Sequence, residues 1–507
     1  MLKRFSVSAE CPSCGAPLDF SVGSNAVSCS HCRSNLLITG RGKVLSYCVQ
    51  PQLDVHRAVA RVMVAPVRSG VRVIKPRLYF IPYHNFTGYE LRWERIKETP
   101  AESMLHGEGG SWMSLDPEEY TVRQVPVAIG EIVEAAGEFF RAVFSKGKKG
   151  VPAEDPPCPA SGMQTAAESK PFRGAHAAAS PALCRGLQLR DRYVTRSSLA
   201  LDMDGTGMYS LGVRPGVVRL ELFRRDKVEA LGRVVRPRVS AETLMSQVTG
   251  METEPECLYR TVLAKTLSLI YFPYWVVECE WRRERSLTIV DAVSGSVVRR
   301  DASITLLEIL DETEQSAPAV VGFRQLICPN CGWDLPVRPD DVIFFCSSCR
   351  KAWQIRQENL NETAYRVADG GDSDTKKQFR YLPLWEVPSV SGEDSAETLP
   401  VPAWRYRRLK TLVELAVRLS GRPMSNALPD TLVGDFVGCY YDEDDALLIA
   451  RFVRAAHMAK TAEDLLKVSE GSVQTGPASL TWIPLEVRGV NLIEPVTGTS
   501  LYRDLIW

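Results

Sequence analysis

Two cysteine quartets with the same spacing constrain this chain more than any other feature of its sequence. In each quartet, fourteen residues (15–28 and 332–345) separate a Cys-Pro-x-Cys pair from a second Cys-x-x-Cys pair, and the first of these fourteen is glycine. Cysteines three apart on a tight turn can direct both sulfurs at one ion, at about 2.3 Å for zinc. Proline presets one backbone angle of such a turn, and glycine tolerates a positive φ angle after it. The ligands predicted in this way are Cys11, Cys14, Cys29, Cys32, Cys328, Cys331, Cys346 and Cys349.

The chemistry of four thiolates predicts structural metal sites. Four sulfurs complete a tetrahedral shell and leave no position for a reactive water molecule. We therefore expect two structural Zn²⁺ ions. A rubredoxin-type iron site uses the same ligands and is one alternative, and redox or disulfide chemistry is another, although it would need only one pair. His31 lies between two ligands, is not needed as a fifth one, and is expected to face solvent.

Composition describes an ordinary globular protein of about three to four domains. The 507 residues are 45% hydrophobic and 24% charged, and 61 basic residues balance 61 acidic ones to a formal net charge of +0. Proteins that bind nucleic acid usually carry a basic surplus, because contacts to phosphate supply most of their affinity. Neutral charge therefore disfavours nucleic-acid binding as the main activity.

The sequence predicts a cytoplasmic protein without a membrane span. No apolar signal-peptide core precedes Cys11. The most apolar stretch, Leu267–Val277, is too short to cross a bilayer and contains Pro273. In a reducing compartment, patterned cysteines bind metal more often than they form disulfides.

Periodicity and composition predict a multi-domain α+β fold, with two small zinc-ribbon modules, mostly antiparallel β units and a few helices. Residues 43–96 favour strands, and helices are expected near 128–144, 240–266, 404–420 and 443–468. The expected divisions are ribbon 1 (1–40), a β-rich domain ending in a helix (41–145), a flexible linker (146–183), an α+β domain (184–320), ribbon 2 (321–360) and a last α+β domain (361–507).

A strand motif with a central proline occurs four times. Two interpretations stay open, convergent strand composition and duplicated β units, and the second and fourth copies are each followed by a glycine turn, at Gly295 and Gly498. Proline removes a donor from a β ladder, so these strands are expected at sheet edges or at bulges. The copies are Tyr79-Phe-Ile-Pro-Tyr83, Tyr271-Phe-Pro-Tyr-Trp275, Tyr381-Leu-Pro-Leu-Trp385 and Trp482-Ile-Pro-Leu485.

The combination of a Cys-Pro-x-Cys-Gly ribbon, a Tyr-x-Pro-x-Trp strand and a Ser/Thr-Gly hairpin resembles uncharacterised prokaryotic zinc-ribbon proteins. The ribbons resemble the rubredoxin-like zinc ribbons of transcription and other assembly factors. This resemblance covers about 60 residues, and it implies the same eight cysteine ligands. It implies no reaction.

The clearest catalytic hint is Leu199-Ala-Leu-Asp202-Met-Asp204-Gly, which resembles the nucleophile motif of haloacid-dehalogenase-type phosphatases. That resemblance implies Asp202 as nucleophile, Asp204 as acid/base and magnesium between them. Asp442, Asp444 and Asp445 could supply further magnesium ligands. However, the family has a helix directly after this motif, whereas 217–223 favours a strand. We therefore expect a polar turn, and consider an enzyme less favoured than a non-enzyme.

The sequence thus favours a non-enzymatic zinc-binding scaffold or adaptor that mediates protein–protein interaction in a cytoplasmic assembly. The first alternative is a transcription-related protein whose ribbons bind nucleic acid. The second is the magnesium-dependent phosphatase described above. For the first alternative, the basic residues near the cysteine pairs are Arg33, Arg41, Lys43, Arg350 and Lys351.

Overall fold

We describe the fold from a computed structural model of the 507-residue chain. The described residues all belong to one compact unit, formed by Met1–Lys97 and Ala179–Trp507. The helix expected near 128–144 and the linker expected at 146–183 lie outside them. The structure describes residues 4–40, 44–64, 70–96, 187–202, 217–240, 242–243, 245–246, 256–312, 321–368, 378–391, 395–420, 434–459, 461–465, 477–495 and 497–506.

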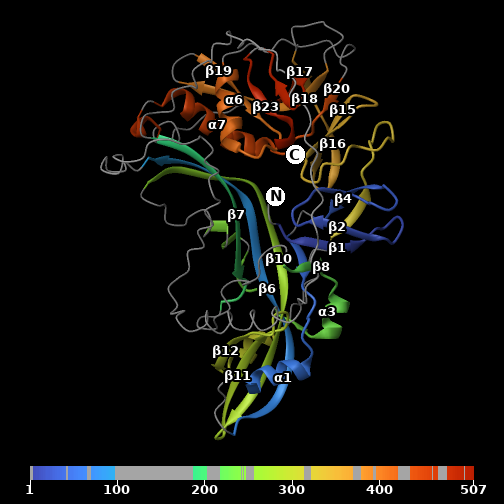
Figure 1. The fold of residues 1–507 in the computed structure, drawn as a ribbon, viewed down its shortest axis with the longest axis vertical. Helices are drawn as coiled ribbons and strands as arrows, with labels where there is room; N and C mark the ends of the chain where they lie inside the picture. Colours follow the sequence, from blue (N-terminus) through green and yellow to red (C-terminus); the bar gives the residue numbers. More distant parts are fainter. Residues whose placement is uncertain are drawn as a thin grey trace, which may run out of the picture. The chain divides into compact units, whose positions relative to one another are not determined.

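The larger of the two main sheets has ten strands, ordered β12-β11-β10-β5-β8-β1-β2, with β6 beside β10 and with β7 and β9 beside β6 (Figure 1). It combines strands from three of the expected divisions, 1–40, 41–145 and 184–320. Its strands are β1 (Ser6–Glu10), β2 (Pro17–Ser21), β5 (Leu45–Cys48), β6 (Arg72–Arg95), β7 (Leu187–Leu199), β8 (Arg219–Leu222), β9 (Arg233–Val234), β10 (Cys257–Trp281), β11 (Glu284–Asp291) and β12 (Val297–Ala302).

The second main sheet has seven strands, ordered β19-β18-β21-β22-β23, with β20 beside β18 and β17 beside β21. Two smaller three-stranded sheets, β13-β4-β3 and β14-β15-β16, belong to the ribbons. The strands are β3 (Ala26–Ser28), β4 (Asn35–Thr39), β13 (Gly322–Gln325), β14 (Ile343–Cys346), β15 (Lys351–Arg356), β16 (Asn359–Thr363), β17 (Tyr365–Val367), β18 (Phe379–Ser391), β19 (Ser395–Pro402), β20 (Gly434–Phe436), β21 (Ser479–Arg488), β22 (Asn491–Ile493) and β23 (Ser500–Tyr502).

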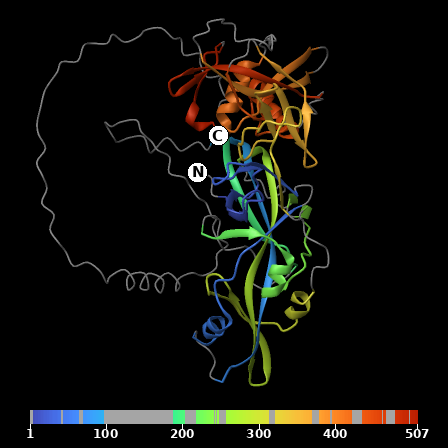
Figure 2. The ribbon, with the colours of Figure 1, turned by 90° about the vertical axis from the view of Figure 1, so that its right-hand side faces the viewer.

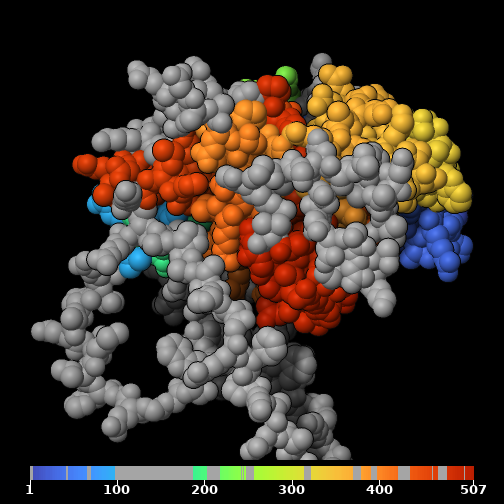
Figure 3. Space-filling view, turned by 90° about the horizontal axis from the view of Figure 1, so that it is seen from above, coloured from blue at the N-terminus to red at the C-terminus, as the bar shows by residue number. Residues whose placement is uncertain are grey.

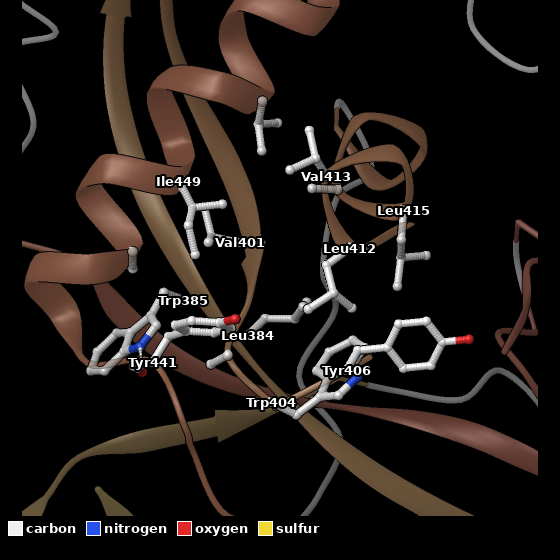
Figure 4. Close-up of a cluster of buried hydrophobic side chains, with 14 of the residues drawn as sticks. Leu384, Trp385, Val401, Trp404, Tyr406, Leu412, Val413, Leu415, Tyr441 and Ile449 are labelled. Atoms are coloured by element: carbon white, nitrogen blue, oxygen red, sulfur yellow. Dashed lines mark hydrogen bonds between the residues drawn. The ribbon is translucent and has the colours of Figure 1, made fainter. Parts of the chain in front are cut away.

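Two helices cover the second sheet, at the places where the sequence predicts helices. Figure 4 shows Leu412 of α6 and Ile449 of α7 above Trp385 and Val401 of the sheet, and all four side chains are buried. These helices carry apolar residues at helical spacing, so each buries one face. The helices are α1 (Val55–Val64), α3 (Arg225–Leu231), α5 (Leu306–Leu310), α6 (Leu409–Leu419), α7 (Glu443–Met458) and the 3₁₀ helix η3 (Arg503–Leu505).

The predicted α+β class with mostly antiparallel strands and a few helices is confirmed, but one local prediction is wrong. Residues 257–266 belong to strand β10 rather than to a helix, because their backbone pairs with β6 on both sides of two bulges. Apolar residues at helical spacing there, Val262, Leu263 and Leu267, instead lie on the two faces of the sheet. The region 43–96 is mainly strand, as expected, with α1 between β5 and β6.

The four proline-centred strands pair two by two, and both pairs have the same register. In the first sheet Pro82 lies opposite Tyr271, two residues before Pro273. In the second sheet Pro383 lies opposite Trp482, two residues before Pro484. Identical register between two separate strand pairs favours the duplication of a β unit over convergent composition.

These strands lie inside the sheets, so the expectation of sheet edges is wrong. The pair of β6 and β10 does carry bulges, but they do not lie at the prolines. Each proline instead marks the point at which the neighbouring strand changes. Along β6, the parallel partner β9 ends opposite Phe80 and the antiparallel partner β7 begins opposite Tyr83, so Pro82 lies between them. Its carbonyl accepts from the amide of Ala200 on this side, and its nitrogen therefore also faces this side.

The other three prolines lie at equivalent changes of partner. Along β10 the change is from β5 to β11, along β18 from β20 to β19, and along β21 from β17 to β22. The carbonyls of Pro273 and Pro383 accept from the amides of Ala292 and Ala403, as Pro82 accepts from Ala200. A missing donor is tolerated at such a point, because neither neighbour needs it.

A buried carboxylate connects regions that are far apart in the sequence. Asp340 accepts from Arg4 at 2.7 Å and also forms an ion pair with Arg405, and these three side chains are 11–15% exposed. Arg4 additionally donates to the hydroxyl of Tyr440, and Arg405 to that of Tyr89. The start of β1, the second ribbon and the second sheet therefore meet at one acid.

We expect the substitution Asp340→Asn to lower the free energy of unfolding by about 3–5 kcal/mol, because it leaves two buried guanidinium groups without their counter-charge. Chemical denaturation at neutral pH measures this value. The control is Asp504→Asn, which removes an 83% exposed acid whose ion pair with Arg503 is 4.0 Å long. The control should change stability by less than about 1 kcal/mol. Equal effects of the two substitutions would contradict the role of Asp340.

A second buried acid joins α7 to the first sheet. The Asp445 carboxylate accepts from the amide of Ala264 at 3.0 and 3.1 Å. Ala264 has a φ angle of +47° and lies at a bulge in β10, where the register shifts between Leu263 and Thr266. Burial, followed by the nearby charge of Asp442, raises the pKa of Asp445 to about 7.

This pKa predicts a specific pH dependence. A carboxyl group whose pKa is higher in the folded state than in the unfolded state stabilises the fold at low pH and loses this contribution as the pH rises. We therefore expect Asp445→Asn, which keeps an acceptor for Ala264, to gain stability relative to the wild type between about pH 4 and pH 7. Denaturation midpoints across this range measure the difference. A difference that does not vary with pH would show that Asp445 is already ionised throughout.

Candidate metal centres

The first cysteine quartet is assembled from two turns. Cys11 and Cys14 lie between β1 and β2, and Cys29 and Cys32 lie between β3 and β4. The Sγ atoms of Cys11 and Cys32 are 3.8 Å apart, and those of Cys14 and Cys29 are also 3.8 Å apart. Sulfurs bound at 2.3 Å to a tetrahedral ion lie roughly 3.8 Å from one another, so this spacing fits a metal site.

The second quartet has the same construction. Its Sγ–Sγ distances are 3.5 Å between Cys328 and Cys349 and 3.6 Å between Cys331 and Cys346. In each quartet the four sulfurs lie within 4.8 Å of one another. A disulfide requires sulfurs at about 2.05 Å, so none of these pairs is bonded. Across the described ranges, these are the only groups of three or more potential ligand residues with such spacing.

Burial divides each quartet in the same way. The first cysteine of every pair is buried, at 1–2% exposure, and belongs to a hydrophobic cluster. The second cysteine is exposed or half-buried. An ion would therefore lie at the boundary between core and solvent, with four protein ligands and no open position. Such a site can hold the ribbon together but offers no position for a substrate.

Hydrogen-bond donors favour the thiolate form, which metal binding requires, at Cys32 and Cys328, whereas burial raises the pKa of Cys346 to about 12. The hydroxyl and then the amide of Ser34 donate to Cys32 and lower its pKa to about 6. Burial opposes ionisation of Cys328, but the amides of Cys331 and Asn330 outweigh it and lower the pKa to about 7. The glycine after each first pair has a positive φ angle, +73° at Gly15 and +75° at Gly332, as predicted.

The two ribbons are joined to each other. Strand β13, which leads into the second ribbon, pairs antiparallel with β4 of the first. The Pro339 carbonyl accepts from the amides of Asn25 and Ala26, and Asn35 donates to the Leu335 carbonyl. Figure 3 shows the blue N-terminal residues beside the yellow residues of the second ribbon. Loss of one metal should therefore weaken the strand pairing and hydrogen bonds that join the two ribbons.

Two further turns repeat the cysteine turn without cysteines. In the first ribbon, Gly15 donates to the Cys11 carbonyl at 2.8 Å, and the amides of Ser13 and Cys14 donate to the Cys11 sulfur. Between β22 and β23, Gly498 donates in the same way to the Glu494 carbonyl at 2.9 Å. There the Thr497 amide donates to the Glu494 carboxylate, which takes the place of the sulfur. Asp291 occupies the same position between β11 and β12.

The residues proposed for a phosphatase have other positions in the fold. Asp202 follows β7, and Asp204 lies outside the described residues. The next described strand, β8, begins at Arg219, as the sequence predicted. Asp442 caps the N-terminus of α7 by accepting from the Asp445 amide at 2.9 Å, and Asp445 holds the bulge of β10. These two acids therefore already have structural partners.

The basic residues near the ribbons are partly explained by turn geometry. Arg33 and Arg350 follow the second pair of each quartet, with φ angles of +60° and +55°. Lys351 forms an ion pair with Glu362 at 2.8 Å. Arg41 and Lys43 lie outside the described residues. His31 is exposed, as expected.

An exposed aromatic group on the second ribbon was not predicted from the sequence. Trp333 directly follows Gly332 and is 67% exposed, and nearby Ile327 is 39% exposed. Ile327 and Asp334 form a backbone bridge, so Ile327 and Asp334 lie on either side of the first cysteine turn of this ribbon. The signal was present in the sequence, because the equivalent position in the first ribbon is the small residue Ala16.

Comparisons with protein-family models, with curated proteins and with solved structures found no match. None of the helices among the described residues is long and apolar enough to cross a membrane.

We expect each quartet to hold one metal ion, so Cys14→Ser and Cys331→Ser should each reduce the bound metal from two equivalents to one per chain. Both cysteines are exposed, so neither substitution creates a packing defect. Elemental analysis for zinc and iron measures the content and identifies the metal. The control is Cys257→Ser, outside both quartets, which should retain two equivalents. Two equivalents in either ligand variant would contradict that site.

Proposed function

We propose that this protein is a non-enzymatic scaffold or adaptor, in which two structural zinc ions stabilise the joined ribbons and the second ribbon binds another protein. The observation that carries the proposal is the exposure of Trp333 together with Ile327. Isolated apolar residues on a surface are common, but tryptophan is strongly enriched among the residues that dominate binding energy in protein interfaces.

The position of Trp333 supports an interface better than a defect in packing. It directly follows a cysteine turn whose backbone is fixed by hydrogen bonds, with Cys328 donating to its carbonyl at 2.7 Å and Gly332 donating to Cys328 at 2.9 Å. A bound metal would fix this turn further. A rigid aromatic group loses little conformational entropy on binding, so its burial by a partner contributes more to affinity.

Zinc is the metal that fits this role best. Four thiolates suit it, it has no redox chemistry of its own, and closed four-cysteine sites generally contribute to folding. A scaffold needs a surface that is stable in the absence of a substrate. The ribbons meet this need, because each completes its coordination shell with protein ligands and β13 joins it to the other.

The test is purification of the tagged full-length protein from its native host at moderate salt, followed by quantitative mass spectrometry. We expect one stoichiometric protein partner. Trp333→Ala should weaken its binding by about 2 kcal/mol or more, which is roughly thirtyfold. The zinc content of this variant should stay at two equivalents, which shows that the ribbon is still folded.

The matched control is Tyr502→Ala. Tyr502 is an exposed aromatic residue on β23, outside the ribbons, with 61% exposure. Its removal should leave partner recovery unchanged. Equal recovery with Trp333→Ala and with Tyr502→Ala would refute the proposed surface, and the absence of any stoichiometric protein partner would refute the scaffold function.

A further inference from the structure

The hairpin between β10 and β11 ends in a two-residue turn of unusual composition. Trp281 and Glu284 form the last backbone pair, so Arg282 and Arg283 make the turn. Their φ angles are +51° and +68°. A turn with two positive φ angles is of type I′, for which Asn-Gly is strongly preferred. The hairpin is drawn in yellow-green in Figure 1 and Figure 2.

Two arginines in this turn are a strained choice. The left-handed conformation brings the Cβ of an ordinary residue close to its own backbone, and glycine or asparagine avoids most of this cost. The two arginines thus lower the stability of the hairpin.

The charges at this hairpin end are only partly balanced. Arg72 forms an ion pair with Glu280, and Arg285 with Glu278, both at 3.3 Å. By contrast, no ion pair with an acid of the described ranges is recorded for either turn arginine. The exposed Glu284 follows the turn, and Lys75 of β6 adds a further exposed cation.

The neighbouring aromatic residue is already in use. The Arg282 guanidinium lies over the Trp281 ring, 4.4 Å from its centroid. This contact orients the guanidinium and covers one face of the indole. The turn therefore offers oriented positive charge and no free aromatic platform on that face. Base stacking, on which single-stranded nucleic acids depend, is not the interaction that this arrangement favours.

We propose that Arg282 and Arg283 bind the phosphate backbone of double-stranded DNA. Guanidinium groups match phosphate oxygens in two-pronged hydrogen bonds, and arginines on a rigid turn lose little entropy when they form them. Double-stranded DNA carries one phosphate charge per about 1.7 Å of its axis, so two adjacent guanidinium groups can contact neighbouring phosphates together. The net charge of +0 for the whole chain does not oppose a local contact of this kind. This proposal is independent of the protein partner proposed for Trp333.

A second hairpin provides a matched control. The turn between β15 and β16 consists of Gln357 and Glu358, with φ angles of +48° and +69°, between the paired residues Arg356 and Asn359. It has the same turn geometry and the same strain, but it adds no positive charge. Asn-Gly can therefore replace either turn with the same expected effect on the backbone.

The experiment compares R282N/R283G with Q357N/E358G in the full-length, metal-loaded protein. Both variants should raise the melting temperature, because both relieve a strained turn, so loss of binding cannot result from unfolding. Fluorescence anisotropy with a short labelled duplex DNA across a salt series measures affinity. We expect R282N/R283G to bind about tenfold more weakly or worse, with a logarithmic salt slope smaller by roughly two. Q357N/E358G should bind like the wild type.

Three results would overturn the proposal. The first is a wild-type protein that shows no salt-dependent binding to duplex DNA. The second is equal DNA affinity for the two turn variants. The third is arginine-dependent binding to anionic phospholipid vesicles without binding to DNA, which would assign the turn to a membrane surface instead. Trp333→Ala should leave DNA binding intact, so failure of the scaffold proposal and failure of this one are distinguishable.

Discussion

A proline nitrogen has no hydrogen to donate, and this constraint decides where the partner strands change in both main sheets. At Pro82 the parallel partner β9 gives way to the antiparallel partner β7, and the same change occurs at the other three prolines. A continuous partner along this side would face a missing donor at each proline. Two shorter partner strands avoid this problem, because one ends and the other begins next to the proline. One central strand therefore organises two neighbours of opposite direction.

The position of the ribbons follows from this arrangement. The parallel partner of β10 is β5, and the parallel partner of β21 is β17. Each of these short strands comes after a ribbon in the sequence, so the two ribbons precede equivalent strands in the two main sheets. They are then joined by β13 and by the ion pairs of Asp340, which bind together segments that the sequence separates by hundreds of residues. The metal sites consequently belong to the core as well as to the surface.

Local chemistry made the two cysteine clusters predictable, whereas long-range strand pairing was hidden. The eight cysteines, the positive φ angles of Gly15 and Gly332, and helices α6 and α7 depend on residues close together in the sequence. The register of β6 and β10 does not, and residues 257–266 therefore resembled a helix until their pairing partner was known. The prolines were also misjudged, because a sequence shows that a donor is missing but does not show which neighbour would have needed it. Trp333 was overlooked for a related reason, since its exposure depends on what packs around the ribbon.

The turns that lack cysteine clarify what the metal contributes. Glu494 accepts the Thr497 amide in the position where Cys11 accepts the Cys14 amide, so a carboxylate can satisfy the same backbone without an ion. The turn geometry therefore does not require metal. A carboxylate in one hairpin does not connect that hairpin to a second turn. Each ribbon contains two cysteine turns, and a metal bound by all four sulfurs would connect them. We conclude that a metal bound by each quartet would hold its two turns in a fixed relation.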